Sequence, residues 1–213
     1  LAVLFLGAAF TEKKHNFFEG KVVYQTYSRD ADGNLIPSIM IGKQEYFYKD
    51  SFSKFRMEMK REGNGLSFTE IVVNTQDSSR HSVDHFKKTF KSLGMEGASL
   101  QYLPMEVKLI HDRDTILGYP CKKYEMIQLD YFTQSPLKSS LWVAEDLKIK
   151  NLPLLARIFG YRNTVIKDGS FNGMILKYEM EKGINLESLL IQASEVKPME
   201  LEVSEFLVPS MYF

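Results

Sequence analysis

MILKYEME, residues 174–181, carries the pattern that decides the fold class of this chain. Its apolar side chains occupy every second position, Met174, Leu176, Tyr178 and Met180, and alternate with Ile175, Lys177, Glu179 and Glu181. Successive side chains of a β-strand point to opposite faces, so a period of two predicts a strand with one face on a core and the other in water. We therefore expect a half-buried strand here.

The same alternation recurs along the chain, in FRMEMK, residues 55–60, and in MELEV, residues 199–203. Strand-forming composition predicts further strands at residues 20–28, 39–48, 68–74, 82–90, 107–110, 119–129, 139–143 and 189–194. The segments DGN, EGNG and KDGS, which begin at Asp32, Glu62 and Lys167, supply residues that suit hairpin turns. Short spacings without long crossovers favour an antiparallel sheet.

Helix signals are few. The best is NLPLLARIFG, residues 151–160, where Asn151 suits an N-cap, Pro153 the first turn and Gly160 the end of a helix. Its apolar stripe would be Leu154, Leu155, Ile158 and Phe159. A second short helix is predicted around residues 97–103. Helices this short need to pack on the sheet to persist.

The composition narrows the domain count and the function classes. The chain has 213 residues, 44% hydrophobic and 25% charged, which suits one folded domain over residues 11–213. Its 27 basic and 27 acidic side chains cancel. The basic excess of a nucleic-acid-binding protein is therefore missing, as is that of a polybasic membrane-binding protein. We predict no nucleic-acid partner.

The first ten residues, LAVLFLGAAF, are uniformly apolar or small. They resemble the end of a signal peptide, with Gly7 and Ala9 as the small residues before a cleavage site. The run is too short to span a bilayer. The alternative is an N-terminal strand or a buried helical turn. We predict a signal-peptide remnant over residues 1–10, and hence an exported protein with no transmembrane segment.

The sequence shows no catalytic or metal-binding constellation. His81 and His85 are four residues apart, which on a strand separates them by about 13 Å, too far to share one metal ion. Cys121 is the only cysteine, so no intramolecular disulfide forms, and a buried, inert thiol is the expectation. A GxSxG elbow and a phosphate-binding Gly loop are both missing. We predict no enzymatic activity, no cofactor and no metal.

Four segments stand in a familiar order: FEGKVVY at residues 18–24, GYPCKKY at 118–124, LWVAEDL at 141–147 and FLVP at 206–209. Together they resemble the exported bacterial domain-of-unknown-function family numbered 4412, whose pattern runs GY.C..Y, W....L and a terminal F..P.GY. The resemblance covers the chain from about Phe17 onward. The chain departs from the pattern at Ser210-Met211-Tyr212, where the family has Glu-Gly-Tyr.

This resemblance implies a fold like that of the periplasmic lipoprotein carriers LolA and LolB. Such a fold is mainly β, a curved antiparallel sheet forming an incomplete barrel, with one to three short helices over its concave face. A cavity of this kind would remove acyl chains from water. We predict an exported, monomeric, non-enzymatic carrier of a lipid, an acyl chain or a lipoprotein segment. It would be periplasmic or extracellular, with peripheral association with the envelope or outer membrane.

The candidate ligand contacts come from strand faces and from the predicted helix. They are Met57, Met59, Trp142, Met174, Leu176 and Tyr178 on strands, with Leu155 and Phe159 as a lid. The chain has 10 methionines, whose flexible side chains suit an adaptable pocket but also simply fill a core. Two alternatives stay open: an envelope protein-interaction or scaffold module with a filled core, and an enzyme whose site is assembled from scattered residues.

Overall fold

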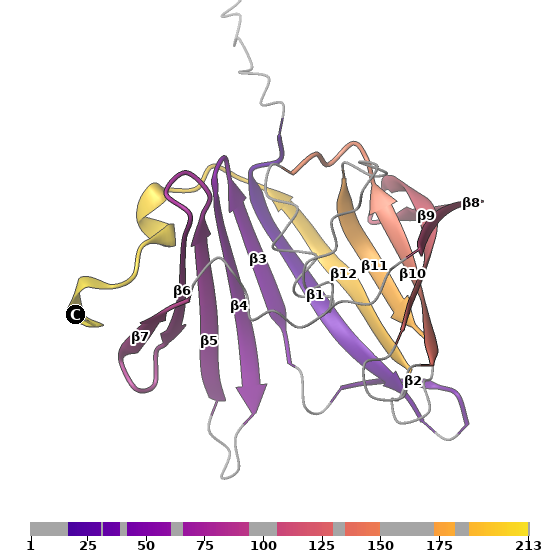
Figure 1. Ribbon diagram of the computed structural model, residues 1–213, viewed down its shortest axis with the longest axis horizontal. Helices are drawn as coiled ribbons and strands as arrows, with labels where there is room; N and C mark the ends of the chain where they lie inside the picture. The colour runs from indigo at the N-terminus through magenta and orange to yellow at the C-terminus, as the bar shows by residue number, and fades with distance from the viewer. Residues whose placement is uncertain are drawn as a thin grey trace, which may run out of the picture.

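The protein forms one large antiparallel sheet that does not close on itself (Figure 1). The structure, a computed structural model, describes residues 17–30, 32–38, 42–60, 66–93, 106–129, 135–149, 173–181 and 188–212. The strands are β1 (Gly20–Arg29), β2 (Leu35–Pro37), β3 (Gln44–Lys49), β4 (Phe52–Lys60), β5 (Leu66–Asn74), β6 (Ser79–Asp84), β7 (Thr89–Ser92), β8 (Glu106–Ile116), β9 (Tyr119–Leu129), β10 (Pro136–Ala144), β11 (Met174–Met180) and β12 (Leu189–Pro198). Two short 3-10 helices follow, η1 (Val203–Phe206) and η2 (Ser210–Tyr212).

The order of the strands is β7-β6-β5-β4-β3-β1-β12-β11-β10-β9-β8, with β2 beside β1. Most neighbours in space are also neighbours in sequence, which is the arrangement that hairpins produce. The exceptions are β1 beside β3, which skips the short β2, and β1 beside β12 in the middle of the sheet. There the first and last strands, indigo and yellow, lie side by side (Figure 1). The prediction of a mainly β, antiparallel architecture is confirmed.

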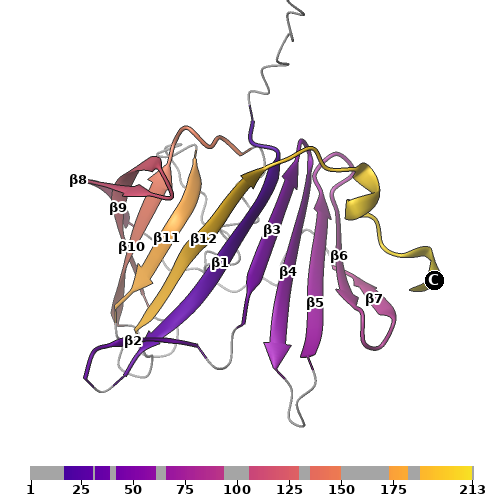
Figure 2. The ribbon, with the colours of Figure 1, turned by 180° about the vertical axis from the view of Figure 1, so that it is seen from behind.

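The sheet is bent rather than flat. In both views, β1 and β12 are seen broadside while β8 and β9 turn nearly edge-on (Figures 1 and 2). Twist of this kind follows from the handedness of L-amino acids, and it accumulates over many strands.

The strand register assigns side chains to two faces, because residues directly opposite one another share a face. One row across the sheet consists of Thr26, Ile191, Tyr178, Leu141 and Tyr124. A second row on the same side consists of Val22, Tyr46, Phe55 and Ile71. We call this side the apolar face. The other side carries Lys21, Glu45, Arg56 and Glu70, and we call it the charged face.

Two strand predictions are wrong. Residues 82–90 form a hairpin rather than one strand, because the side chain of Asp84 ends β6 by accepting hydrogen bonds from the backbone N–H groups of Phe86 and Lys87, both at 3.0 Å. Residues 199–203 are not a strand either. There the N–H of Leu201 donates to the carboxylate of Glu19 at 2.8 Å instead of to a neighbouring strand.

The half-buried pattern predicted for residues 174–181 holds only for its second half. Met174, Ile175 and Leu176 are all buried. The register between β10 and β11 shifts between Trp142 and Val143, which leaves Leu176 without a directly opposite partner. Such a bulge interrupts the alternation of faces, so Ile175 is not on a wet face as the sequence pattern predicted.

The structure describes no α-helix in any of its residue ranges. The predicted helices at 97–103 and 151–160, and residues 1–10, lie outside these ranges. The helix η1 lies against the charged face, where Phe206 contacts Phe52 with ring centroids 5.7 Å apart and packs with Val72. The helix η1, which the sequence pattern did not predict, therefore packs on the side opposite the apolar face. No described helix has the length and apolar character that a membrane crossing needs.

Candidate functional site

The centre of the apolar face is a cluster of aromatic rings from β1, β3 and β4. The ring of Tyr46 lies 5.0 Å from that of Tyr24 and 4.8 Å from that of Phe55, measured between centroids. Tyr48 stacks on Tyr46 at 6.5 Å. Rings at these separations attract one another beyond the burial of their area. Because the residues come from adjacent strands, the sheet itself fixes their spacing.

The polar atoms of this face are hydroxyls and amides, and most are paired. Tyr24 donates to the carbonyl of Ile175 at 2.7 Å. Tyr46 donates to Gln44 at 3.2 Å, and Gln44 in turn donates to Thr26 at 2.8 Å. Burial raises the pKa of the Tyr24 and Tyr46 hydroxyls well above the usual value for tyrosine. The cluster is therefore uncharged at any physiological pH.

Within the described ranges, two neighbouring hydroxyls on the same face, those of Tyr48 and Ser53, lack the hydrogen bonds that the others form. Tyr48 and Ser53 lie directly opposite each other on β3 and β4, and both are buried. Neither the Tyr48 Oη nor the Ser53 Oγ has a hydrogen-bond partner among the described residues. A buried hydroxyl without a partner costs free energy, so native proteins retain few of them without a reason. This pair is the most distinctive polar feature of the apolar face.

The predicted contact residues do not all converge on one surface. Met57 lies on the apolar face opposite Gln44 and is partly buried. Tyr178 lies on the same face, and its hydroxyl is 3.1 Å from that of Ser139. Met174 and Leu176 are buried in the same core cluster. The side chain of Met59, and residues Leu155 and Phe159, lie outside the described part of the chain.

Trp142 points to the charged face, unlike Met57 and Tyr178, but it is buried and belongs to the same core cluster as Met174 and Leu176. It stands opposite Lys123 and Lys177, one residue along from Leu141 on the apolar face. Their ammonium groups lie 5.1 and 4.1 Å from the centre of the indole ring, close enough for cation–π attraction. The sequence motif that holds Trp142 gave no indication of its face, because that depends on the register with β9 and β11.

The sequence interpretation missed the tyrosines that dominate the apolar face. Tyr46 and Tyr48 stand two apart, as do Val22 and Tyr24, and this spacing places each pair on one face of its strand. The sequence spacing therefore placed these tyrosines on one face, but the candidates were chosen from the alternating methionines instead. Ser53 carries no sequence signal, because only its register with Tyr48 marks it.

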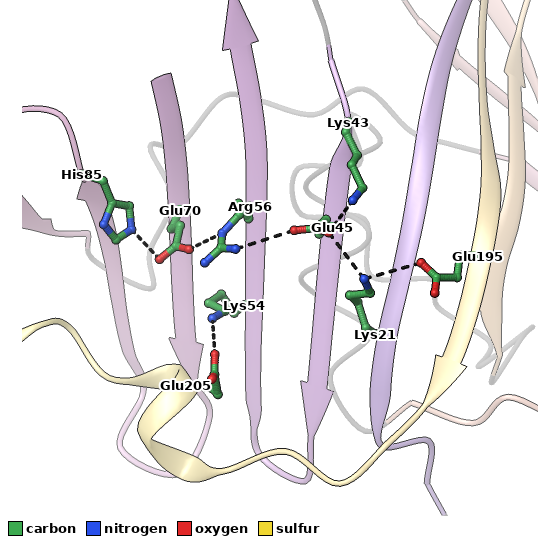
Figure 3. Close-up of polar contacts among 9 residues, drawn as sticks. All are labelled: Lys21, Lys43, Glu45, Lys54, Arg56, Glu70, His85, Glu195 and Glu205. Carbon is green, nitrogen blue, oxygen red and sulfur yellow. Dashed lines mark hydrogen bonds and ion pairs between the residues drawn. The ribbon is translucent and has the colours of Figure 1, made fainter. Parts of the chain in front are cut away.

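The charged face carries a chain of ion pairs that crosses five strands, β5, β4, β3, β1 and β12, and Figure 3 shows its members. Glu70 contacts Nε2 of His85 at 2.7 Å and Nε of Arg56 at 2.6 Å. Arg56 reaches Glu45 at 3.7 Å, and Glu45 also pairs with Lys43 at 2.9 Å. The chain continues through Lys21, which lies 3.6 Å from Glu45 and 3.5 Å from Glu195.

These contacts set the protonation of the two central carboxylates. Burial alone would raise the pKa of Glu70, but His85 and Arg56 outweigh it, and the pKa lies below the usual value for glutamate. Burial alone would also raise the pKa of Glu45. The positive charges of Lys43 and Lys21 outweigh burial, and the pKa of Glu45 lies below the usual value for glutamate. Both side chains are therefore ionised at neutral pH, and the chain of charges is complete.

Within the described part of the chain, Cys121 and the histidines near β6 are further chemically reactive side chains. Cys121 is buried, and burial raises the pKa of its thiol to about 11, so the prediction of a buried thiol is confirmed. His81 lies on β6, whereas His85 lies beyond its end. In the residue ranges that the structure describes, no group of three or more His, Cys, Asp or Glu side chains is placed to hold a metal ion.

No family model matches this chain, and no curated protein matches it at a significant level. The resemblance to the domain-of-unknown-function family numbered 4412 therefore stays a prediction.

Proposed function

We propose that this protein binds an amphipathic apolar molecule, a lipid or an acyl chain, against the apolar face of its sheet. The observation that supports the proposal is the combination of a buried, uncharged aromatic cluster with the hydroxyl pair of Tyr48 and Ser53, which has no hydrogen-bond partner among the described residues. An acyl chain gains most from the removal of apolar surface from water. Its carbonyl or carboxylate end would accept the hydrogen bonds that these two hydroxyls have to give.

The finer fold and location belong to the same proposal. An incomplete barrel like that of the lipoprotein carriers LolA and LolB would bend the apolar face around such a chain. Export to the bacterial envelope, as the first ten residues suggest, would place the protein where it meets lipids or lipoprotein segments. It would then act as a carrier without catalytic chemistry.

The test is lipid uptake by the delipidated chain, followed by native mass spectrometry and by titration with a long-chain fatty acid. We expect one bound fatty acid. Tyr48→Phe keeps the ring and removes one donor, so the affinity should fall roughly 2- to 10-fold, as the net value of one hydrogen bond implies. Tyr27→Phe is the matched control, because Tyr27 lies on the charged face, and it should leave the affinity unchanged.

A chain that carries no lipid after expression and takes up none on titration would overturn the proposal. The alternative, an envelope scaffold with a filled core, would then be favoured. Equal loss of affinity in Tyr48→Phe and Tyr27→Phe would also count against the apolar face as the binding surface.

A further inference from the structure

The turn of the β6–β7 hairpin exposes an apolar ring among lysines. The turn consists of His85, Phe86, Lys87 and Lys88, and Lys91 follows on β7. Phe86 is 68% exposed, more than any other large hydrophobic side chain in the described ranges. The three lysines are exposed, and none forms an ion pair within the described part of the chain.

A second turn of the same molecule shows that this composition is not needed for folding. In the β5–β6 turn, the side chain of Asn74 accepts a hydrogen bond from the backbone N–H of Gln76 at 3.0 Å. In the β6–β7 turn, Asp84 does the same for Phe86, also at 3.0 Å. In both turns, a side-chain oxygen therefore accepts a hydrogen bond from the backbone N–H two residues further along the chain.

The two turns also share their last residue's conformation. Ser78 has φ 57° and Lys88 has φ 53°, a left-handed conformation that costs a lysine free energy. At equivalent positions, residues 76–78 are Gln-Asp-Ser, whereas residues 86–88 are Phe-Lys-Lys. The polar, acidic sequence makes the same turn, so the ring and the lysines of the second turn serve something other than its geometry.

The base of the β6–β7 turn is anchored, which holds its tip away from the sheet. His85 lies between Glu70, 2.7 Å from its Nε2, and the hydroxyl of Tyr212, 3.0 Å from its Nδ1. Val83, two residues before, is buried opposite Phe90. With His85 held at its base and Val83 buried, the turn presents Phe86 to solvent.

We propose that this tip docks on an anionic lipid surface. Phe86 enters the boundary between head groups and acyl chains, and Lys87, Lys88 and Lys91 contact the anionic head groups. A ring surrounded by basic side chains is the chemistry that membrane interfaces select. A protruding tip with one ring needs no complementary groove, which an acidic protein partner would have to supply. The proposal stands independently of lipid binding on the apolar face.

The neutral net charge of the chain limits the range of this attraction. With 27 basic and 27 acidic side chains, the chain has no net charge to attract it to an anionic membrane from a distance. The three lysines act only once the tip is within about a Debye length, roughly 8 Å at physiological salt. Binding should therefore be reversible, selective for anionic lipid and weakened by salt.

The experiment measures co-sedimentation of the full chain with vesicles of phosphatidylcholine, alone or with about a third phosphatidylglycerol. The decisive variant is the graft Phe86→Gln, Lys87→Asp, Lys88→Ser, which copies the β5–β6 turn. Each lysine near an anionic surface is worth roughly a fivefold gain in partitioning, so the loss of two alone should lower it at least about 25-fold. The charge-matched control is Lys138→Glu with Lys148→Gln, which also lowers the net charge by three, at two exposed sites away from the tip.

Several results would contradict membrane docking by the tip, and each can be told apart from the others. Wild type that binds both vesicle types equally, or a folded graft that binds as tightly as wild type, would overturn the proposal. So would a control variant that loses as much binding as the graft, since the effect would then be one of net charge. Binding to an acidic protein but to no vesicle would reassign the tip to a protein partner. The single variant Phe86→Ser should weaken binding while leaving its salt dependence unchanged.

Discussion

The two faces of this sheet solve the same packing problem with different chemistry. On the apolar face, rings such as Tyr24 and Tyr46 bury their surface and carry no charge. On the charged face, Glu70 is also buried but stays ionised between Arg56 and His85. One face should therefore stabilise the fold independently of pH, and the other should do so only while its carboxylates are ionised.

The largest effect should come from the apolar face. Tyr24→Ala removes a ring that is 0% exposed and one hydrogen bond to Ile175, and should lower the free energy of unfolding by about 3–5 kcal/mol, as large-to-small core substitutions do. Tyr27→Ala, on the same strand but facing the other way and only partly buried, should cost about 1 kcal/mol or less. Urea denaturation of both variants measures the difference.

A matched variant separates the ring from its hydroxyl. Tyr24→Phe keeps the packing and leaves only the Ile175 carbonyl without its partner, so about 1 kcal/mol should be lost. If Tyr24→Ala and Tyr27→Ala destabilise the protein equally, the distinction between the two faces is wrong.

An intermediate effect should come from the centre of the charged face. Glu70→Gln removes the charge that Arg56 and His85 contact, and should cost about 1–3 kcal/mol at neutral pH, the value of a buried charged hydrogen-bonding group. The same substitution should also change how stability depends on pH. The measurement is the free energy of unfolding from neutral pH down to acid.

The sign follows from the direction of the pKa shift. The pKa of Glu70 is lowered in the folded protein, so its contribution is present above the unfolded value of about 4.3 and is lost as the pH falls through the folded value. Wild type should therefore lose more stability than Glu70→Gln below about pH 4.3. Parallel pH profiles for the two proteins would contradict the assignment of Glu70 as a stabilising charge.

The same two faces mark how far the sequence predicts this structure. Alternation identified most strands, because the period of two is a local property of the chain. It failed at Ile175, where a bulge buries consecutive residues, and at Leu201, which is buried by packing against Val72 rather than by strand pairing. Bulges and packing across the sheet depend on residues far apart in the sequence, so a local sequence pattern does not predict them.

The candidate site was harder to predict for a related reason. Whether Trp142 faces Tyr178 or the lysines depends on the register of β10 with β9 and β11, which is set by pairing over the whole sheet. The pairing of Tyr48 with Ser53 is likewise a matter of register between β3 and β4. Residue type predicted that the site would be apolar. Which residues belong to it could be known only from the strand register.

The smallest effect should come from the ion pair between Lys54 and Glu205, which ties η1 to the charged face at 3.1 Å. Glu205→Gln keeps an acceptor for the lysine and removes only the charge, at a carboxylate whose side chain is 53% exposed. Solvent screens the carboxylate, and Lys54, whose side chain is only 4% exposed, keeps the amide oxygen of the new side chain as a partner, so the loss should stay below about 1 kcal/mol. Lys54 itself is held by the ring of Phe47, 4.6 Å from its ammonium group. The charge on Glu205 therefore matters less than the burial of Phe206 beside it, and a loss as large as that of Glu70→Gln would show instead that the ion pair anchors the C-terminal segment.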